Sequence, residues 1–240
     1  MAKVGVIVFP GSNCDHDAYH ALKYVMNVDV KFLWHKETDL SGLDIIIVPG
    51  GFSYGDYLRS GAIARFSPIM QELIEYVKKG GPVMGICNGF QILLEAGLIP
   101  GAMRHNEKLK FICKDVHIRV ESTQSIYTSS LQKDQLLKIP ISHGEGNYYI
   151  DNDGIKELQD NDQVLFRYVN VHGDATPEAN INGSIDHIAG VTNKQKNVLG
   201  MMPHPERAME QLLGKEDGKQ IFESISVSYT HLTLPTMDSV

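Results

Sequence analysis

Hydrophobic residues in the first hundred positions form short runs separated by amphipathic segments. Residues 4–9, 44–49 and 82–84 are almost continuously apolar, and residues 28–34 form a further apolar stretch. Continuous runs of this length are typical of strands buried on both faces. The segments between them have helical spacing. In one segment, Ala18, Ala21, Leu22 and Val25 lie on one helical face. A later helix is predicted to start at Ser67-Pro68 and to stop at Lys79-Gly80. Alternating strands and helices predict an α/β fold with a doubly wound, mostly parallel sheet.

The second half of the chain is less regular. Residues 116–120 alternate between apolar and polar positions, residues 164–169 and 198–202 are further strand candidates, and residues 173–183 have the composition of a loop. We therefore expect a small additional antiparallel β element in this half. Residues 1–225 are predicted to form one domain. Residues 226–240 form a tail without assigned function, for which a disordered terminus and a cloning or sequencing scar are the alternatives.

Gly85-Ile86-Cys87-Asn88-Gly89 follows one predicted strand and precedes a predicted helix. Flanking glycines permit a sharp strand-to-helix turn, which exposes the central side chain beside free N–H groups at the helix start. The positive end of the helix dipole lowers the pKa of a thiol at this place and favours a nucleophilic thiolate. The alternative is a small buried cysteine at a strand end. Gly50-Gly51 ends the neighbouring strand at the same carboxyl edge, where such sheets bind ligands.

Pro203-His204-Pro205-Glu206 follows the last predicted strand. In an extended chain residues i and i+2 project to the same side, so Glu206 can orient His204. Taken alone, these residues favour the ordinary interpretation, a surface histidine and a glutamate in the first turn of a helix. Together with Cys87 they predict a triad of nucleophile, general base and orienting carboxylate. The backbone N–H groups of Asn88 and Gly51 are the expected oxyanion hole, although the glycine pair also fits simple turn chemistry.

Composition and charge narrow the classes of function. The 240 residues carry a formal net charge of −7, which argues against nucleic acid or an anionic membrane as the main partner. No apolar run approaches a membrane span, and the start lacks a signal-peptide pattern. The three cysteines lack C-x-x-C spacing, which predicts no disulfide framework, no metal site and a reducing cytoplasm. Cys14 and Cys113 are interpreted as structural because no base candidate pairs with them in the sequence.

Three motifs in this order resemble class I glutamine amidotransferases: Pro49-Gly50-Gly51, residues 85–91 (Gly-Ile-Cys-Asn-Gly-Phe-Gln) and residues 203–206. The resemblance implies their flavodoxin-like fold and the hydrolysis of glutamine to glutamate and ammonia through a cysteine thioester. It implies that Cys87, His204 and Glu206 are catalytic and that Gln91, one helical turn after Cys87, contacts the substrate. His143 and Gly144 match a loop that lines the glutamine pocket. An ordinary loop histidine and a solvated helical glutamine are the competing interpretations.

Four further blocks, residues 8–15, 51–59, 143–146 and 197–207, are similar to the family's glutaminase subunits that serve phosphoribosylformylglycinamidine synthesis in de novo purine biosynthesis. The similarity covers roughly residues 3–225. It implies that ammonia passes to a synthetase subunit that converts formylglycinamide ribonucleotide with ATP and Mg²⁺, helped by a small third subunit. No nucleotide-binding motif is visible in this chain, and no cofactor is expected in it.

Three alternatives stay open at the level of sequence. One is a glutaminase subunit for another synthetase, such as that for histidine, anthranilate or pyridoxal phosphate. The second is a cysteine hydrolase or chaperone of the same fold, and the third is a regulatory binding subunit without catalysis. The loop with Tyr54, Asp56 and Arg59 has either a surface role or a role in a partner interface.

Overall fold

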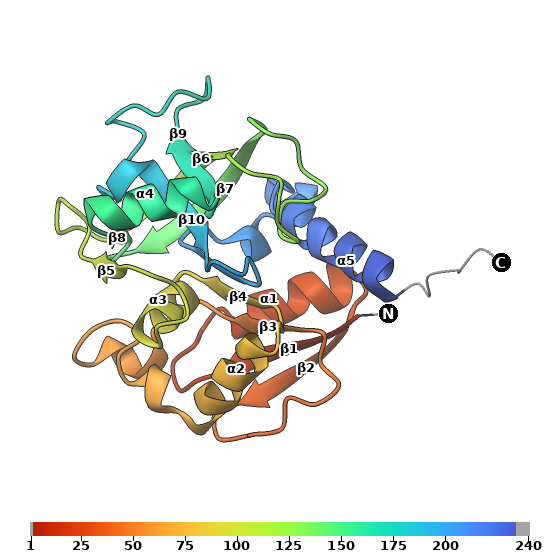
Figure 1. Cartoon of the computed structure of the whole chain (residues 1–240). Helices are drawn as coiled ribbons and strands as arrows, with labels where there is room; N and C mark the ends of the chain where they lie inside the picture. The colour runs from red at the N-terminus through yellow and green to blue at the C-terminus, as the bar shows by residue number, and fades with distance from the viewer. Residues whose placement is uncertain (1, 234–240) are drawn as a thin grey trace.

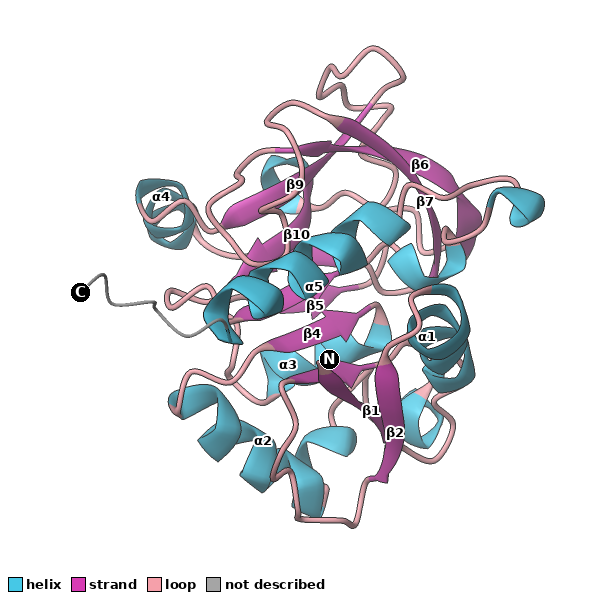
Figure 2. Ribbon diagram, turned by 90° about the vertical axis from the view of Figure 1, so that its right-hand side faces the viewer, coloured by secondary structure: helices cyan, strands magenta, loops and turns pink. Residues whose placement is uncertain are grey.

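A computed structural model describes residues 2–233. Its centre is a nine-stranded sheet with the order β2-β1-β3-β4-β11-β10-β9-β6-β7, and helices cover both faces (Figure 1). Figures 1 and 2 show α1 and α5 on one face and α2 and α3 on the other. Within residues 2–233, no helix combines the length and the apolar character that a membrane crossing requires.

The first part of the sheet is parallel and confirms the predicted α/β fold. It consists of β1 (Lys3–Val8), β2 (Asp29–Trp34), β3 (Ile45–Val48), β4 (Val83–Ile86) and β11 (Val198–Met201). All pairs among these strands are parallel. Every residue of β3, β4 and β11 is buried, as expected for strands covered by helices on both faces. Their carboxyl ends therefore meet at one edge.

Residues 2–233 form five α-helices. They are α1 (Asp15–His20), which continues as a π-helical turn over Ala21–Val25, α2 (Pro68–Lys78), α3 (Asn88–Glu95), α4 (Asn152–Asp160) and α5 (Lys219–Thr233). The start of α2 is as predicted, but the Ser67 side chain does not cap the helix. Its hydroxyl lies 3.0 Å from the Tyr54 hydroxyl instead.

The rest of the sheet is antiparallel and larger than the sequence suggests. It contains β6 (Ile112–Val120), β7 (Leu136–His143), β9 (Val164–Val169) and β10 (Ile188–Thr192). Strand β10 joins it to the parallel part through an antiparallel pairing with β11. A separate two-stranded antiparallel sheet pairs β5 (Ala102–Arg104) with β8 (Asn147–Tyr149). The expected antiparallel element is thus present twice, once as this small sheet and once as an extension of the main one.

The last helix is longer than expected. The sequence predicts that the domain ends at residue 225, but α5 continues to Thr233. The hydroxyl groups of Ser226 and Ser228 donate to the carbonyls of Phe222 and Ser224, four residues earlier, a pattern that satisfies serine within a helix. The predicted tail 226–240 therefore begins inside α5, and residues 234–240 lie outside the described part of the chain.

Candidate active site

Cys87 stands at the turn between β4 and α3 with φ 50° and ψ −107°. A non-glycine residue rarely adopts a positive φ, and such strain is typical of functional sites. The turn is tight because a Cβ on Gly89 would collide with the carbonyl of Val48, and one on Gly85 with the side chain of Leu93. The Cys87 N–H donates to the Met201 carbonyl at 2.8 Å. The predicted elbow is therefore present, with its thiol at the carboxyl edge of the sheet.

His204 and Glu206 form a buried pair just beyond β11. Their Nδ1 and Oε1 atoms are 2.6 Å apart, and their side chains are 2% and 0% exposed. Burial disfavours the charged imidazolium, but the Glu206 carboxylate and the Cys87 thiolate outweigh it and raise the pKa of His204 well above its ordinary value. Within the described residues, His204 Nε2 has no hydrogen-bond partner. That nitrogen is available for a proton from the thiol or from a substrate.

Gly50 separates the imidazole from the elbow. A Cβ on this glycine would lie 2.8 Å from Cε1 of His204, 3.2 Å from Sγ of Cys14 and 3.4 Å from Cβ of Cys87. The imidazole and both thiol side chains therefore converge on the same small space, which only the absence of a side chain at position 50 leaves open. The Cys87 thiol itself points toward the Ser142 carbonyl, 3.7 Å away.

The two backbone groups predicted for the oxyanion hole flank the thiol. Gly51 has φ +128°, and a Cβ there would lie 2.8 Å from Cα of Ser12, so this position requires glycine. Asn88 is the first residue of α3, where backbone N–H groups have no partner inside the helix. Among the hydrogen bonds of residues 2–233, neither the Gly51 nor the Asn88 backbone N–H acts as a donor. Both remain free to bind an oxyanion.

A cavity of about 220 Å³ opens at the thiol. It is smaller than the usual 300–1,000 Å³ of drug-sized ligand sites and suits a small metabolite. Its lining includes the predicted residues Gly51, Cys87, Gln91, His143 and Gly144. The structure thus brings the predicted pocket residues to one place, while His204 and Glu206 lie behind the thiol and outside the lining.

Gln91 is part of a fixed network and is not a solvated helix residue. It is 4% exposed. Its Oε1 accepts from Asn88 Nδ2 at 2.9 Å, and its Nε2 donates to the Glu145 carbonyl at 2.5 Å. These contacts connect the elbow helix to the loop after β7, which forms the opposite wall of the cavity.

His143 is buried beside the triad. Burial, and secondarily the charge of His204, lower its pKa to about 3. Its Nδ1 lies 3.1 Å from Oδ1 of Asn106. A neutral imidazole held in this way can shape the pocket wall, but it carries only one ring proton and no charge at neutral pH.

Cys14 lies close to the His204–Glu206 pair. The sequence favours a structural role because no base candidate pairs with it, yet its Sγ lies within 4.8 Å of ligand atoms of His204 and Glu206. Arg207 Nη2 is 3.1 Å from the same sulfur. The signal in the sequence was its place after β1, at the same edge as Cys87. Cys113, by contrast, is exposed on β6.

Cys14, His204 and Glu206 lie close enough together to be considered as metal ligands, and cysteine, histidine and glutamate are ligand types of zinc. Here, however, Glu206 already uses an oxygen to bind His204, and this arrangement fits a hydrogen-bonded triad. That the site works without a metal stays a prediction.

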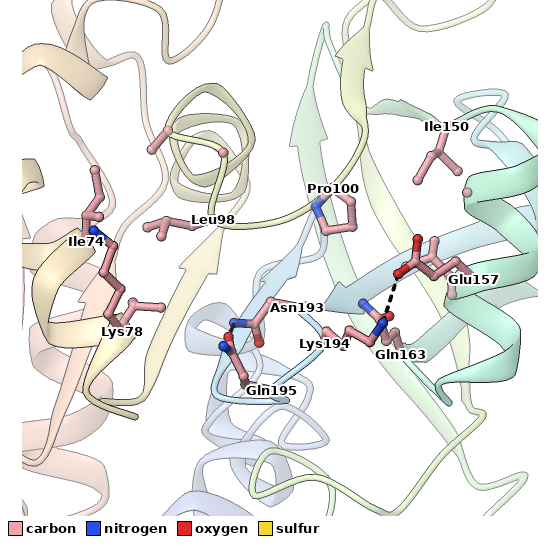
Figure 3. Close-up of a pocket in the computed structure, with 15 residues that line it drawn as sticks. Ile74, Lys78, Leu98, Pro100, Ile150, Glu157, Gln163, Asn193, Lys194 and Gln195 are labelled. Atoms are coloured by element: carbon pink, nitrogen blue, oxygen red, sulfur yellow. Dashed lines mark hydrogen bonds and ion pairs between the residues drawn. The ribbon is translucent and has the colours of Figure 1, made fainter.

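A larger cavity of about 470 Å³ lies at the opposite, amino-terminal edge of the parallel strands (Figure 3). Its walls come from the ends of α2 and α3, from α4 and from the turn before β11. Figure 3 shows polar side chains that include Glu157 and Lys194, which form an ion pair of 3.3 Å. No cysteine or histidine lines this cavity, so it lacks the thiol and the imidazole that the predicted triad requires. The smaller cavity at Cys87 is the candidate active site.

Comparisons with known proteins give a consistent result. Residues 1–224 match the model of the CobB/CobQ-like glutamine amidotransferase domain. The phosphoribosylformylglycinamidine synthase subunit PurQ of Salinibacter ruber is 57% identical over 224 residues, which cover 93% of this chain and 95% of the relative. The PurQ subunit of Synechocystis is 54% identical and is covered over its full length, together with 93% of this chain.

The fold agrees with a solved assembly. A chain of the PurLQS structure from Thermotoga maritima superposes with a TM-score of 0.84 at 44% identity, covering 95% of this chain and 99% of that one. A putative GMP synthase subunit from Thermoplasma acidophilum, at 18% identity, has a TM-score of 0.62 and supports the fold alone.

Proposed function

Because the chain belongs to the family of CobB/CobQ-like glutamine amidotransferases, we infer that it is the glutaminase subunit of phosphoribosylformylglycinamidine synthase. It releases ammonia from glutamine for a step of purine biosynthesis, in a complex with a synthetase subunit. Its identity of 54–57% to PurQ subunits over nearly the whole chain supports this assignment. The observation that carries the chemistry is the thiol elbow facing a buried histidine–carboxylate pair. That pair argues against a regulatory subunit without catalysis.

The reaction begins at Cys87. Its thiolate attacks the side-chain amide carbon of glutamine while His204 holds the thiol proton as imidazolium. The oxygen of the tetrahedral intermediate accepts hydrogen bonds from the Gly51 and Asn88 N–H groups, each worth about 3–4 kcal/mol of transition-state stabilisation. His204 then protonates the leaving nitrogen, and ammonia departs from the thioester.

Hydrolysis of the thioester completes the cycle. His204 now takes a proton from water, the hydroxide attacks the thioester carbon, and the thiolate leaves as glutamate forms. Glu206 keeps the Nδ1 proton in place during both steps, so Nε2 always faces the reacting atoms. Gln91, His143 and Gly144 shape the wall against which glutamine binds.

The partner assignments complete the proposal. The synthetase subunit supplies ATP and Mg²⁺ chemistry, this chain needs no cofactor of its own, and a small third subunit completes the complex. Exposed apolar side chains at the pocket support docking there: Phe52 and Phe111 line the cavity and stack with ring centroids 6.4 Å apart. Tyr57 and Leu58, which follow Asp56 in the chain, are also exposed. Docking on this surface would pass ammonia to the partner without exposure to water. The three free thiols agree with a cytoplasmic location.

The decisive experiment uses the whole complex. Cys87→Ala should abolish synthesis driven by glutamine and leave synthesis driven by added ammonium salt at the wild-type rate. Cys113→Ala, which removes an exposed thiol outside the site, should leave both rates unchanged. Retention of the glutamine-driven rate in the Cys87→Ala complex would show that Cys87 is not the nucleophile. Failure of the wild-type chain to stimulate any glutamine-dependent synthesis would reject the function itself.

A further inference from the structure

Two acidic side chains, Asp56 and Glu145, line the cavity that contains the Cys87 thiol. Asp56 ends the 3₁₀ turn Ser53–Asp56 after β3, and Glu145 follows β7. In the ion pairs of residues 2–233, Asp56 has no cationic partner, and Glu145 has only His105, at 3.4 Å with a side chain that is 70% exposed. Two carboxylates thus share a small pocket without a buried cation between them.

The elbow helix holds the Asp56 carboxylate and the Glu145 backbone in relation to the nucleophile. Asn88, the residue after Cys87, donates from Nδ2 to Oδ1 of Asp56 at 3.2 Å and to Oε1 of Gln91 at 2.9 Å. Gln91 in turn donates to the backbone carbonyl of Glu145. Because this chain of hydrogen bonds starts beside the thiol, the acidic wall has a fixed position relative to the reacting atom.

The loop that carries Asp56 has an unusual backbone. Tyr54, Asp56 and Leu58 have φ values of 54°, 53° and 72°. Left-handed conformations at non-glycine residues cost on the order of 1–3 kcal/mol each and persist where the surrounding structure imposes them. Here they bring the Asp56 carboxylate into the cavity.

Burial, and secondarily the charge of Glu145, raise the pKa of Asp56 to about 6. The pocket is therefore electrostatically unfavourable for the ionised Asp56 carboxylate. A cation that binds between Asp56 and Glu145 offsets this penalty on Asp56, whereas an anion or a neutral group does not. The ligand that fits this wall and the thiol together has a primary ammonium at one end and an amide at the other.

We propose that Asp56 and Glu145 together bind the α-ammonium group of glutamine and make the site specific for the free amino acid. The proposal rests on the glutaminase function and adds to it the residues that recognise the end of the substrate remote from the scissile amide. Neither carboxylate takes part in bond breaking. Their contribution is to substrate binding and orientation, which places the amide carbon at Cys87.

The test compares two substrates in the complete complex. One is glutamine, and the other is 4-carbamoylbutanoate, which has the same amide and carboxylate but lacks the α-amino group. The wild-type complex should prefer glutamine strongly. Asp56→Asn and Glu145→Gln should each raise KM for glutamine about 10- to 100-fold, the range expected for hydrogen bonds to charged groups. They should leave kcat/KM for 4-carbamoylbutanoate almost unchanged.

The ratio of the two kcat/KM values separates recognition from a purely structural role. If Asp56 only supports Asn88, its substitution lowers both values equally and the ratio stays constant, which would overturn the proposal. Asp153→Asn removes an exposed charge from the first turn of α4 and is the matched control, with no expected change in either value.

A binding measurement makes the test independent of turnover. In the Cys87→Ala background, titration calorimetry should show glutamine binding that weakens at least tenfold when Asp56→Asn is added. Equal affinity in the two backgrounds would reject the ammonium site while leaving the glutaminase function intact. Absence of glutamine binding by the Cys87→Ala chain and of turnover by the wild-type complex would reject both.

Discussion

Gly50 is the position where a single added methyl group should disable the site although no reacting residue is replaced. A Cβ there would lie 2.8 Å from Cε1 of His204, whereas carbon atoms in favourable contact are about 3.5–4.0 Å apart. Gly50→Ala therefore forces the imidazole to move by about 1 Å, or moves the elbow by a similar amount. A misplacement of this size costs on the order of 100-fold in rate, or about 2.7 kcal/mol in the activation barrier.

The assay is glutamine-dependent synthesis by the complex, with ammonium-dependent synthesis as the internal reference. The expected result is a kcat for glutamine about 100-fold lower, with KM within a few-fold of wild type because the substrate pocket is intact. Gly42→Ala is the control, since a Cβ at Gly42 meets nothing within 4 Å. Its φ of +70° should cost about 1–2 kcal/mol of stability and no activity. A Gly50→Ala complex with kcat within twofold of wild type would refute the reasoning.

Three further predictions concern charge. Glu206→Gln should lower kcat by about 10²- to 10⁴-fold with little change in KM, because His204 loses its orienting carboxylate; a loss confined to KM would contradict this role. At pH values above 6, Asp56→Asn should raise the melting temperature, because burial and the charge of Glu145 disfavour the ionised Asp56 carboxylate in the folded chain. This gain should vanish as pH falls from about 6 to 3.8, where Asp56 becomes protonated in both states; a gain that persists at low pH would exclude charge as its cause. The pKa of His143 falls from 6.5 to about 3 on folding. Between about pH 3 and 6.5, His143 is therefore protonated to the imidazolium in the unfolded chain and neutral in the folded one. The wild type should therefore lose about 2 kcal/mol of unfolding free energy by pH 5, a loss that chemical denaturation should not find in His143→Gln.

Sequence patterns predicted the parallel half of the fold because its strands are buried on both faces. Residues 45–48 and 83–86 form β3 and β4 as expected, since a short continuous apolar run is typical of a strand covered by helices on both sides. Strand β7 was not predicted because Pro140 interrupts it. That proline lies opposite Asp115 in the β6–β7 ladder, and its carbonyl accepts the N–H of His204. Pairing of this kind depends on contacts that a single segment does not reveal.

In the candidate site, too, some residues could be predicted from the sequence and others could not. Cys87, His204 and Glu206 were predicted from two local patterns taken together, glycines around a thiol and prolines around a histidine, because neither pattern is decisive alone. Asp56 gave no such signal, since an aspartate in a loop is usually a solvated turn residue. Its place in the pocket follows from the left-handed backbone at its position and from the contact with Asn88, 32 residues later. Only the folded chain brings these two together.

The pairing of β4 with β11 also determines the stage of protein synthesis at which the active site can form. Ile86 lies opposite Met201 in this ladder, so the nucleophile and its base follow neighbouring strands that are more than 110 residues apart in the chain. During synthesis, which presents the amino-terminal part first, the cysteine elbow emerges long before its histidine. The base arrives only with β11, which occupies the place between β4 and β10. A ribosome-bound or truncated chain that ends before β11 thus has the thiol without the proton acceptor, and it cannot consume glutamine before the rest of the sheet exists.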